Sequence, residues 1–547
     1  MSSFKDALMS SQHFTTTEKG AKALATLQPM DMKTESVHGR VAFFFKTVRS
    51  LLEDEPQLFK HFQDALNEDA LDAMKLLFHL RNCRKADKET AGGKGERELF
   101  RLCVKYLKQS GRQRLIDCNI ELVPQFGRWD DVLYCGDSGY RHMAQQLLKD
   151  YHTTQEEKKS EISLASKWAP RYKTRKVEAG KVIDALNSLL TQQKKTLFGR
   201  SVIREAEYRK LLSACTNHLS LLERLMCEKR WDEIDFNQVP SRAMNKYGKN
   251  FIKVYNPQKG RKVEEPTSGA FLRHCEERFT KWRNDLKRGV DDQGKKVKIN
   301  ASQVFPHELV YPYLSNEAFD ATREAQWAQL EKELTEHQMM DDALYVVDVS
   351  GSMSCSIPNS SATAMSVAVA LGLLGSRCLK GPFKDLLITF SSEPQIHQVR
   401  SQSLFDRVRE VVRLVGYSTN LQAVFDLMLK TCTEKKVSVD DVPKKIVLIS
   451  DMEFDMATNN TQTNFEAIQD KYQKAGYPMP TLVFWNVCSS MQESYPVSAG
   501  EHNTVLLSGF STSMLHSFMR APDDLTPYKM VRSVIDHAEY NKVCVPE

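Results

Sequence analysis

The chain has 547 residues, of which 41% are hydrophobic and 27% charged, as in ordinary globular proteins, and this is enough for about three to four domains. There is no apolar run of about 18 residues and no signal-peptide pattern at Met1–Met9, so we expect no membrane association. The twelve cysteines are scattered, which excludes a zinc knuckle or a disulfide scaffold and predicts reduced thiols in the cytoplasm or the nucleus.

The net charge of +6 is unevenly distributed along the chain. Residues 341–547 carry 18 Lys and Arg against 23 Asp and Glu, a net charge of −5, so +11 falls to residues 1–340. One interpretation is ordinary surface charge. The other is an N-terminal region that faces an anion and a C-terminal region that binds a cation.

The pattern from about Phe43 to Leu334 is helical. In Leu71–Leu80 the apolar residues recur at steps of three and four, which predicts one apolar face of a helix. The same spacing predicts helices over Glu98–Leu107, His142–Leu148, Val182–Leu190, Glu205–Leu212 and His218–Leu225. Such helices favour a HEAT-like stack of helix pairs, although no strict period assigns a standard repeat family. Charged loops are expected at Arg261–Pro266 and Gly289–Lys298.

Basic residues in this region provide candidate RNA contacts. Gly92-Gly-Lys94-Gly95 resembles a phosphate loop but is not a Walker A motif, because Gly95 follows the lysine where Ser or Thr is needed. Interleaved cations and aromatic rings suit phosphates and unpaired bases. The alternative is a core of aromatic anchors with solvated lysines. The candidate nucleic-acid residues are Lys94, Arg97, Lys167, Trp168, Arg171, Lys173, Arg242 and Lys246.

Beyond about residue 340 strands and helices alternate. Strands are expected at Ala343–Val349, Asp385–Phe390, Gln395–Val399, Lys445–Ser450, Thr481–Cys488 and Asn503–Leu507. Helices are expected at Ala362–Cys378, Leu404–Leu414, Leu421–Cys432, Phe465–Ala475, Thr512–Met519 and Leu525–Tyr540. This alternation predicts a doubly wound, Rossmann-like α/β fold with a parallel sheet covered on both faces.

Side-chain oxygens follow the strands of this sheet. Asp348, Ser350 and Ser352 follow the first strand, Asp451 follows the fourth, and Thr419 lies in a loop before a helix. Ligands of such sheets bind beyond the carboxyl ends of the strands. If the first and fourth strands are neighbours, these five oxygen-bearing residues meet there. They predict a site for a hard cation, Mg²⁺ or else Mn²⁺ or Ca²⁺.

With these five residues the segment 341–547 is similar to the von Willebrand factor type A domain. Asp348-x-Ser350-x-Ser352, Thr419 and Asp451 match its metal-ion-dependent adhesion site. The resemblance implies Mg²⁺ held by the hydroxyls, aspartates that often act through water, and a protein partner that supplies a carboxylate. The loop Gly416–Thr419 departs from the Gly-Gly-Thr of many members.

The helical half resembles the TROVE module of the Ro autoantigen group, and more closely an uncharacterised eukaryotic and viral family with the same two-part layout. The segments that carry this resemblance are Gly92–Phe100, Val123–Leu133, Leu164–Arg171 and Val239–Tyr247. It implies a ring of helical repeats that binds RNA. No individual RNA-contacting residue is transferred from the family.

The resulting layout is an N-terminal extension (1–40), a TROVE-like helical region (41–340) and a type A-like domain (341–547). We expect a non-enzymatic, ribonucleoprotein-type protein, with RNA on the helical part and an acidic partner on the metal. The alternative is a protein–protein scaffold without RNA. An enzyme is disfavoured because the His-Glu-x-x-His, Gly-x-Ser-x-Gly and Walker A motifs are all missing from the sequence.

Overall fold

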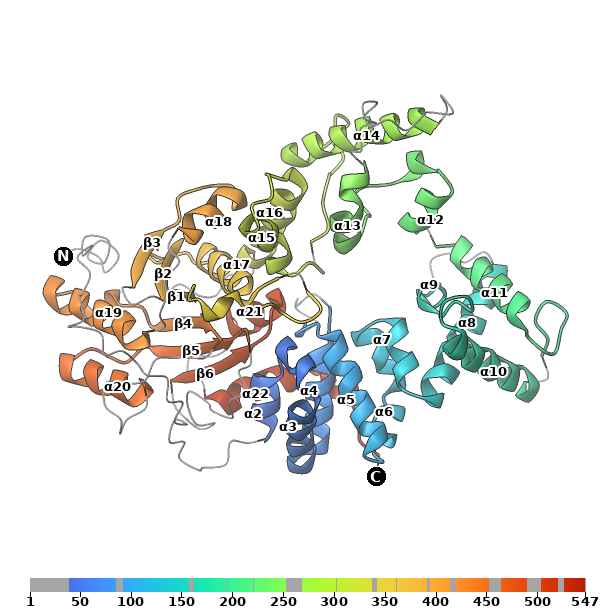
Figure 1. Ribbon diagram of the computed structural model, residues 1–547, viewed down its shortest axis with the longest axis horizontal. Coiled ribbons are helices and arrows are strands. Elements are labelled where there is room, and N and C mark those ends of the chain that lie inside the picture. Colours follow the sequence, from blue (N-terminus) through green and yellow to red (C-terminus); the bar gives the residue numbers. More distant parts are fainter. Residues whose placement is uncertain are drawn as a thin grey trace. The chain divides into compact units, whose positions relative to one another are not determined.

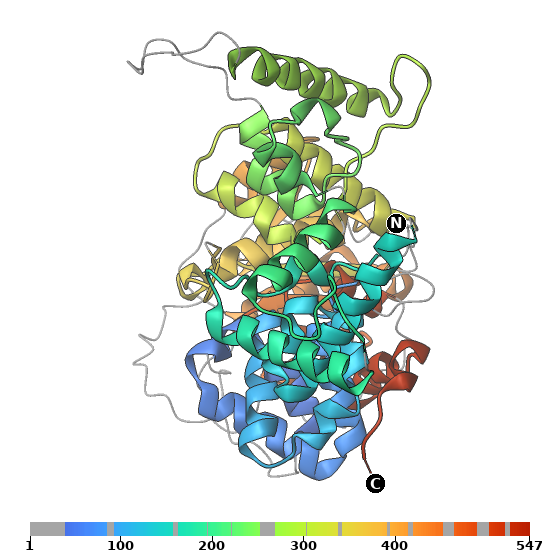
Figure 2. The same cartoon turned by 90° about the vertical axis from the view of Figure 1, so that its right-hand side faces the viewer.

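The computed structural model forms two compact units, which we describe one at a time (Figures 1 and 2). The sheet unit contains the described residues up to 76, from 92 to 96, and from 301 to 539. The helical unit contains 77–84, 97–300 and the residues from 540 onward. The structure describes residues 39–84, 92–156, 162–193, 195–219, 221–251, 268–301, 303–336, 342–360, 362–390, 394–413, 420–451, 464–488, 503–519 and 526–546.

The sheet unit is built on six strands in the order β3-β2-β1-β4-β5-β6, with β3 antiparallel and the others parallel. The order reverses between β1 and β4, the position at which doubly wound sheets bind ligands. Most strand residues are fully buried, as expected for a sheet covered on both faces. The strands are β1 (Ala343–Asp348), β2 (Leu386–Phe390), β3 (Gln395–Gln398), β4 (Lys445–Ser450), β5 (Thr481–Asn486) and β6 (Thr504–Ser508).

Helix α17 (Ala364–Arg377) lies directly on β1. A Cβ added at Gly372 would clash with Val347, and one added at Gly375 would clash with the Tyr345 ring, so glycine allows this close approach. Val347 and Tyr345 therefore face α17, and Asp348, next along the strand, alternates away. The unit's other helices in the C-terminal part of the chain are α15 (Pro306–Leu314), α16 (Ala321–Thr335), α18 (Leu404–Val412), α19 (Leu421–Lys435), α20 (Asn464–Ala475), α21 (Thr512–Met519) and α22 (Pro527–Ile535).

The first described helix belongs to the sheet unit as well. Helix α2 (Gly39–Lys46) packs against β6 and α22, and Figure 1 shows it beside them. Ser508 Oγ, at the end of β6, donates a 3.0 Å hydrogen bond to the Phe44 carbonyl of α2. The short helix η1 (Arg49–Glu53) and helix α3 (Glu55–Glu68) follow, and then α4 (Ala70–Arg81), of which only the residues up to Leu76 belong to this unit.

The helical unit has α8 at its centre, packed against both α10 and α11. Its apolar core includes Leu147, Leu186 and Leu211, all fully buried. The helices of this unit are α5 (Arg97–Gln109), α6 (Arg114–Asp117), η2 (Ile120–Leu122), α7 (Val123–Phe126), η3 (Trp129–Tyr134), α8 (Asp137–Gln155), α9 (Ala165–Trp168), α10 (Lys176–Gln192), α11 (Glu205–Asn217), α12 (Leu222–Cys227), η5 (Trp231–Glu233), α13 (Ser241–Phe251) and α14 (Ser268–Arg288).

The expected layout of helices followed by an α/β sheet is confirmed at this level. All six strands lie within two residues of their expected ends. The helix expected over His218–Leu225 is wrong in its bounds, because α11 continues to Asn217 and α12 starts only at Leu222. The loop expected at Arg261–Pro266 lies outside the described residues. In the part of the chain that the structure describes, no helix combines the length and apolar character that a bilayer crossing requires.

Candidate functional site

The ends of β1 and β4 bring two of the expected metal-site segments together. The two strands are parallel neighbours, with Val347 opposite Ile449, so Asp348 and Ser450 end them side by side. Ser450 Oγ lies 2.6 Å from Asp348 Oδ2 and 3.3 Å from Asp451 Oδ1, and it can donate to either carboxylate. Ser350 N–H donates to Asp348 Oδ1 at 2.9 Å. We call Asp348, Ser350, Ser352, Ser450 and Asp451 the strand-end cluster.

The Asp348 carboxylate is buried. Its side chain has no solvent exposure, and this burial raises the pKa of Asp348 to about 6, with a smaller contribution from the nearby charge of Asp451. The hydrogen bonds from Ser450 and Ser350 act in the opposite direction, because they favour the ionised carboxylate. A buried negative charge that is only partly compensated is the electrostatic condition for attracting a cation.

The two serine hydroxyls are spaced in a way that is compatible with a magnesium ion. Ser350 Oγ and Ser352 Oγ share a hydrogen bond of 3.0 Å. Two neighbouring oxygens in an octahedron of Mg²⁺, each about 2.1 Å from the ion, are themselves separated by about 3 Å. Ser352 starts the short helix η6 (Ser352–Ser354) and is exposed, whereas Ser350 is buried. The pair therefore extends from the interior of the protein to its surface. Both oxygens of Asp348 already accept hydrogen bonds, which suits a carboxylate that acts through water.

The remaining expected metal ligand is Thr419, which lies outside the described residues. Among the residues that are described, no group of three or more His, Cys, Asp or Glu side chains could hold a metal ion. The candidate site therefore depends on hydroxyls as well as on its two carboxylates.

Ser450 is a site residue that the sequence analysis missed. It forms the link between the two aspartates, although serine at a strand end is unremarkable by itself. The available signal was its position, directly before Asp451 on the strand expected beside β1.

Lys94 is not a surface residue, which corrects its assignment as an RNA contact. It is 1% exposed, and its Nζ donates to the carbonyls of Phe44 and Thr47 (3.0 Å for Thr47) and to Ser508 Oγ at 2.7 Å. Three acceptors match the three N–H groups of an ammonium. Burial lowers the pKa of Lys94 to about 7. Lys94 thus ties residues 92–96 to α2 and to the end of β6.

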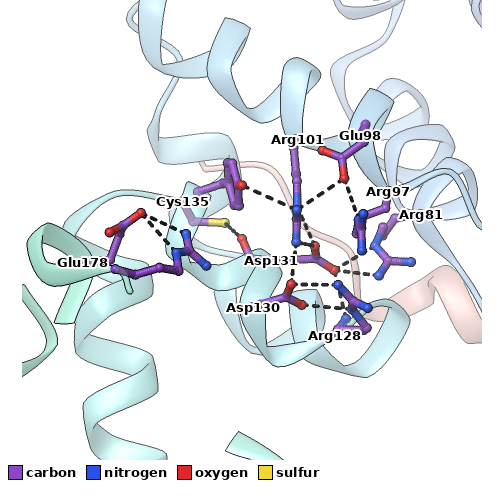
Figure 3. A network of polar contacts seen from close by, with 11 residues as sticks. Arg81, Arg97, Glu98, Arg101, Arg128, Asp130, Asp131, Cys135 and Glu178 are labelled. Carbon is purple, nitrogen blue, oxygen red and sulfur yellow. Dashed lines mark hydrogen bonds and ion pairs between the residues drawn. The ribbon is translucent and has the colours of Figure 1, made fainter. Parts of the chain in front are cut away.

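The helical unit contains a network of arginines and acids, shown in Figure 3. Its centre is Asp131, which is fully buried and pairs with Arg81 at 2.7 Å and with Arg101 at 2.7 Å. Arg101 also reaches Asp130 at 2.8 Å, and Arg128 pairs with Asp130 at 2.7 Å. We call these five residues, with Arg97 and Glu98, the arginine cluster.

Gly127 makes this packing possible. A Cβ at that position would lie 2.6 Å from Asp131 Oδ2 and 2.8 Å from Arg81 Nε, too close for either atom. Burial by itself would raise the pKa of Asp130, but the hydrogen bonds and charges of Arg128 and Arg101 hold it below its usual value. The centre of the cluster is therefore a buried ionic network that contributes to the fold.

The edge of the cluster brings three of the expected RNA residues into one set of contacts. Arg97 pairs with Glu98 at 2.6 Å, and its side chain is 40% exposed. The Arg128 guanidinium lies 4.1 Å from the centre of the Trp168 ring, and Lys167 Nζ is 5.7 Å from the same ring. Lys167 also pairs with Glu223 at 3.5 Å. Arg128 was not among the expected contacts, although it lies in the Val123–Leu133 segment that carried the TROVE resemblance.

The other expected RNA residues lie on the surface of the helical unit. Arg171 and Lys173 are exposed just after α9, and Arg171 donates to the Ser166 carbonyl at 3.1 Å. Arg242 and Lys246 are exposed on α13, where Lys246 Nζ lies 5.0 Å from the Tyr247 ring. Helix α13 packs against α14 and contributes no residue to the arginine cluster.

Two family models match the chain. One, described as "Domain of unknown function (DUF2828)", covers residues 139–258 and includes Lys167, Trp168, Arg171, Lys173, Arg242 and Lys246. The other, described as "Domain of unknown function (DUF7788)", covers residues 342–542 and includes the whole strand-end cluster. The exposed cations and the candidate metal site therefore fall in two different matched domains.

One viral protein is similar to nearly the whole chain. The "Uncharacterized protein L728" of Acanthamoeba polyphaga mimivirus is 30% identical over 555 residues, which cover 97% of this chain and 88% of the viral protein. Similarity at this level includes both matched domains and the segments between them. The chain therefore belongs to the same protein family as mimivirus L728.

Proposed function

We propose that the protein is a non-enzymatic binding protein whose α/β part, similar to a von Willebrand factor type A domain, holds Mg²⁺ at the strand-end cluster and binds an acidic partner through it. The observation that carries this proposal is the link from Asp348 through Ser450 to Asp451, beside two hydroxyls spaced 3.0 Å apart. Together these groups form an oxygen-rich edge at the reversal of strand order.

The residues of the cluster have distinct parts in this proposal. The hydroxyls of Ser350 and Ser352 would hold the ion, and Asp348 and Asp451 would balance its charge. Ser450 and the Ser350 N–H keep the Asp348 carboxylate in one orientation. A bound Mg²⁺ would supply an open position that attracts a carboxylate of the partner. Among the described residues, neither serine hydroxyl is hydrogen-bonded to a histidine or lysine that could activate it, which favours binding over catalysis.

Titration calorimetry of the full-length protein with Mg²⁺ and with Mn²⁺ tests this proposal. We expect one binding site that is lost in Asp348→Asn. Asp342→Asn is the matched control, because Asp342 precedes the same strand and pairs with Lys444 at the surface. Equal binding by both variants, or no binding by the unmodified protein, would contradict the metal site.

We propose, second, that the helical unit binds single-stranded RNA and belongs to a HEAT-like, TROVE-like module. The observation that favours this function is the contact between Arg128 and Trp168, next to the exposed Arg97. A half-buried indole with cations beside it suits base stacking with phosphate contacts. The alternative, a protein scaffold without RNA, predicts partners that EDTA releases and RNA never displaces.

Fluorescence anisotropy with a single-stranded RNA oligonucleotide across a salt series tests the RNA proposal. Removing one phosphate-binding cation makes the slope of log K against log salt shallower by about 0.7. We expect Arg97→Ala to lower the affinity and to make this slope shallower. Arg230→Ala is the control, since Arg230 is a similarly exposed arginine of the same unit that pairs with Glu228 and Glu233. Identical salt slopes for both variants would contradict the proposal.

A further inference from the structure

Two cysteine sulfurs meet beside the strand-end cluster. Cys355 Sγ and Cys488 Sγ are 3.5 Å apart, although 133 residues separate them in the chain. Cys355 is exposed and Cys488 is half-buried. The structure describes all twelve cysteines and none of them is in a disulfide, so this pair is in contact without a covalent bond. A disulfide has an S–S length of about 2.05 Å, and a shift of about 1.5 Å would therefore close it.

The fold places this pair across the candidate metal site. Cys355 directly follows η6, and its N–H donates to the Ser352 carbonyl at 3.1 Å. Cys488 follows β5, where its N–H donates to Asn486 Oδ1 at 3.0 Å, and the neighbouring Val487 N–H donates to the Ser450 carbonyl. Strand β4 lies between β1 and β5, so a bond between these cysteines would cross the end of β4, where Asp451 stands.

We propose that Cys355 and Cys488 form a reversible disulfide that bridges the end of β4 and fixes the turn carrying Ser350 and Ser352. The oxidant is a small disulfide such as oxidised glutathione. The Cys355 thiolate, on the more exposed residue, attacks it and releases one glutathione thiolate. The Cys488 thiolate then attacks the Cys355 sulfur and releases the second. The two thiol protons and two electrons end on two molecules of reduced glutathione.

The effect on the metal site rests on the proposed function. Closing the bond pulls the exposed Cys355 toward the end of β5, because Cys488 is held there by Asn486. Ser352, three residues earlier and hydrogen-bonded to Cys355, moves with it. Mg²⁺ demands near-ideal octahedral geometry, so a shifted hydroxyl weakens its binding. The oxidised protein thus holds the ion less tightly than the reduced protein.

Redox titration of the full-length protein tests the disulfide. The protein is equilibrated in glutathione buffers of increasing oxidised fraction, quenched with N-ethylmaleimide and mapped by peptide mass spectrometry. We expect a Cys355–Cys488 linked peptide that disappears on reduction and is missing in Cys355→Ser and in Cys488→Ser. Cys118→Ser/Cys544→Ser is the matched control, because it removes the other close pair of exposed cysteines, whose sulfurs contact each other's carbonyls. Failure to find the linked peptide at full oxidation, or its loss only in the control, overturns the proposal.

Calorimetry with Mg²⁺ on the oxidised and reduced forms tests the coupling. We expect the oxidised form to bind roughly tenfold more weakly, the size of effect seen when the surroundings of metal ligands are disturbed. Equal affinities would overturn the coupling. If the linked peptide forms but the reduced protein binds no Mg²⁺, the disulfide stands and the proposed metal function fails.

Discussion

Ser450 Oγ is 2.6 Å from Asp348 Oδ2, and the contact joins the last residue of β4 to the last residue of β1. We predict that Ser450→Ala lowers the free energy of unfolding by about 1–3 kcal/mol, because a buried carboxylate loses a hydrogen-bond donor. Mg²⁺ affinity falls about tenfold, since the orientation of Asp348 is no longer fixed. Urea unfolding and calorimetry measure the two effects, with the exposed Thr433→Ala as the control for loss of a hydroxyl. Unchanged Mg²⁺ affinity would contradict a positioning role for Ser450.

The raised pKa of Asp348 gives a pH dependence with a definite sign. Between its ordinary pKa of 3.8 and the folded value of about 6, the folded protein binds more protons than the unfolded chain. Stability of the metal-free protein therefore falls as pH rises through this window, by up to about 3 kcal/mol for this one group. Asp348→Asn removes this contribution. We predict that the variant equals the unmodified protein near pH 4 and exceeds it in stability at pH 7 without metal.

Urea unfolding from pH 4 to pH 7 in EDTA measures this difference. Asp342→Asn again serves as the control. Its stability relative to the unmodified protein should not rise between pH 4 and pH 7 as that of Asp348→Asn does. A variant that is less stable than the unmodified protein at pH 7 would mean that the Asp348 charge is well compensated inside the fold.

Replacing Lys94 distinguishes a structural role of this buried lysine from a direct contact with RNA. Lys94→Met removes the donor to the Phe44 and Thr47 carbonyls and to Ser508, so we expect a loss of about 1–3 kcal/mol in stability. RNA affinity of the folded variant should not change. Lys60→Met, at an exposed position of α3, is the control for lysine replacement. Weaker RNA binding by a stable Lys94→Met variant would instead support a direct contact between Lys94 and RNA.

Asp131 tests whether the centre of the arginine cluster is structural. Asp131→Asn leaves Arg81 and Arg101 buried without their shared carboxylate. We therefore predict that it lowers the free energy of unfolding of the helical unit by about 3–5 kcal/mol. Chemical denaturation followed by circular dichroism measures it. Asp232→Asn, which affects an exposed pair with His274, should cost far less. Similar losses in both variants would show that the buried network contributes little.

The sequence predicted best where a local pattern decides the structure. The apolar runs Ala343–Val347 and Ile446–Ile449 predicted strands, and the structure has Asp348 as the last residue of β1 and Asp451 directly after β4. The sequence did not predict that the first and fourth strands are neighbours, because contacts between strands about 100 residues apart leave no local signal. The structure shows that β1 pairs with β4.

Two of the failures, at Lys94 and Ser450, come from contacts between residues that are far apart in the chain. Lys94 sits in Gly-Gly-Lys-Gly, a context typical of solvent-exposed loops, and its burial depends on Ser508, 414 residues away. The role of Ser450 depends on Asp348, 102 residues away. The helix expected at His218–Leu225 failed for a local reason, because the apolar spacing runs across the junction between α11 and α12 and gives no sign of the break.

The hydrogen bond between Ser508 and Phe44 has a consequence for synthesis of the chain. Phe44 leaves the ribosome 464 residues before Ser508. At translation rates of about 5–20 residues per second, α2 waits roughly 20–90 s for the strand that it covers. During this interval α2 can already pack against α3, where the Phe43 and Phe62 ring centroids lie 5.0 Å apart, but its contact with β6 has to wait. Emergence of β6, and not emergence of the first helices, then sets the moment at which α2 can join the sheet.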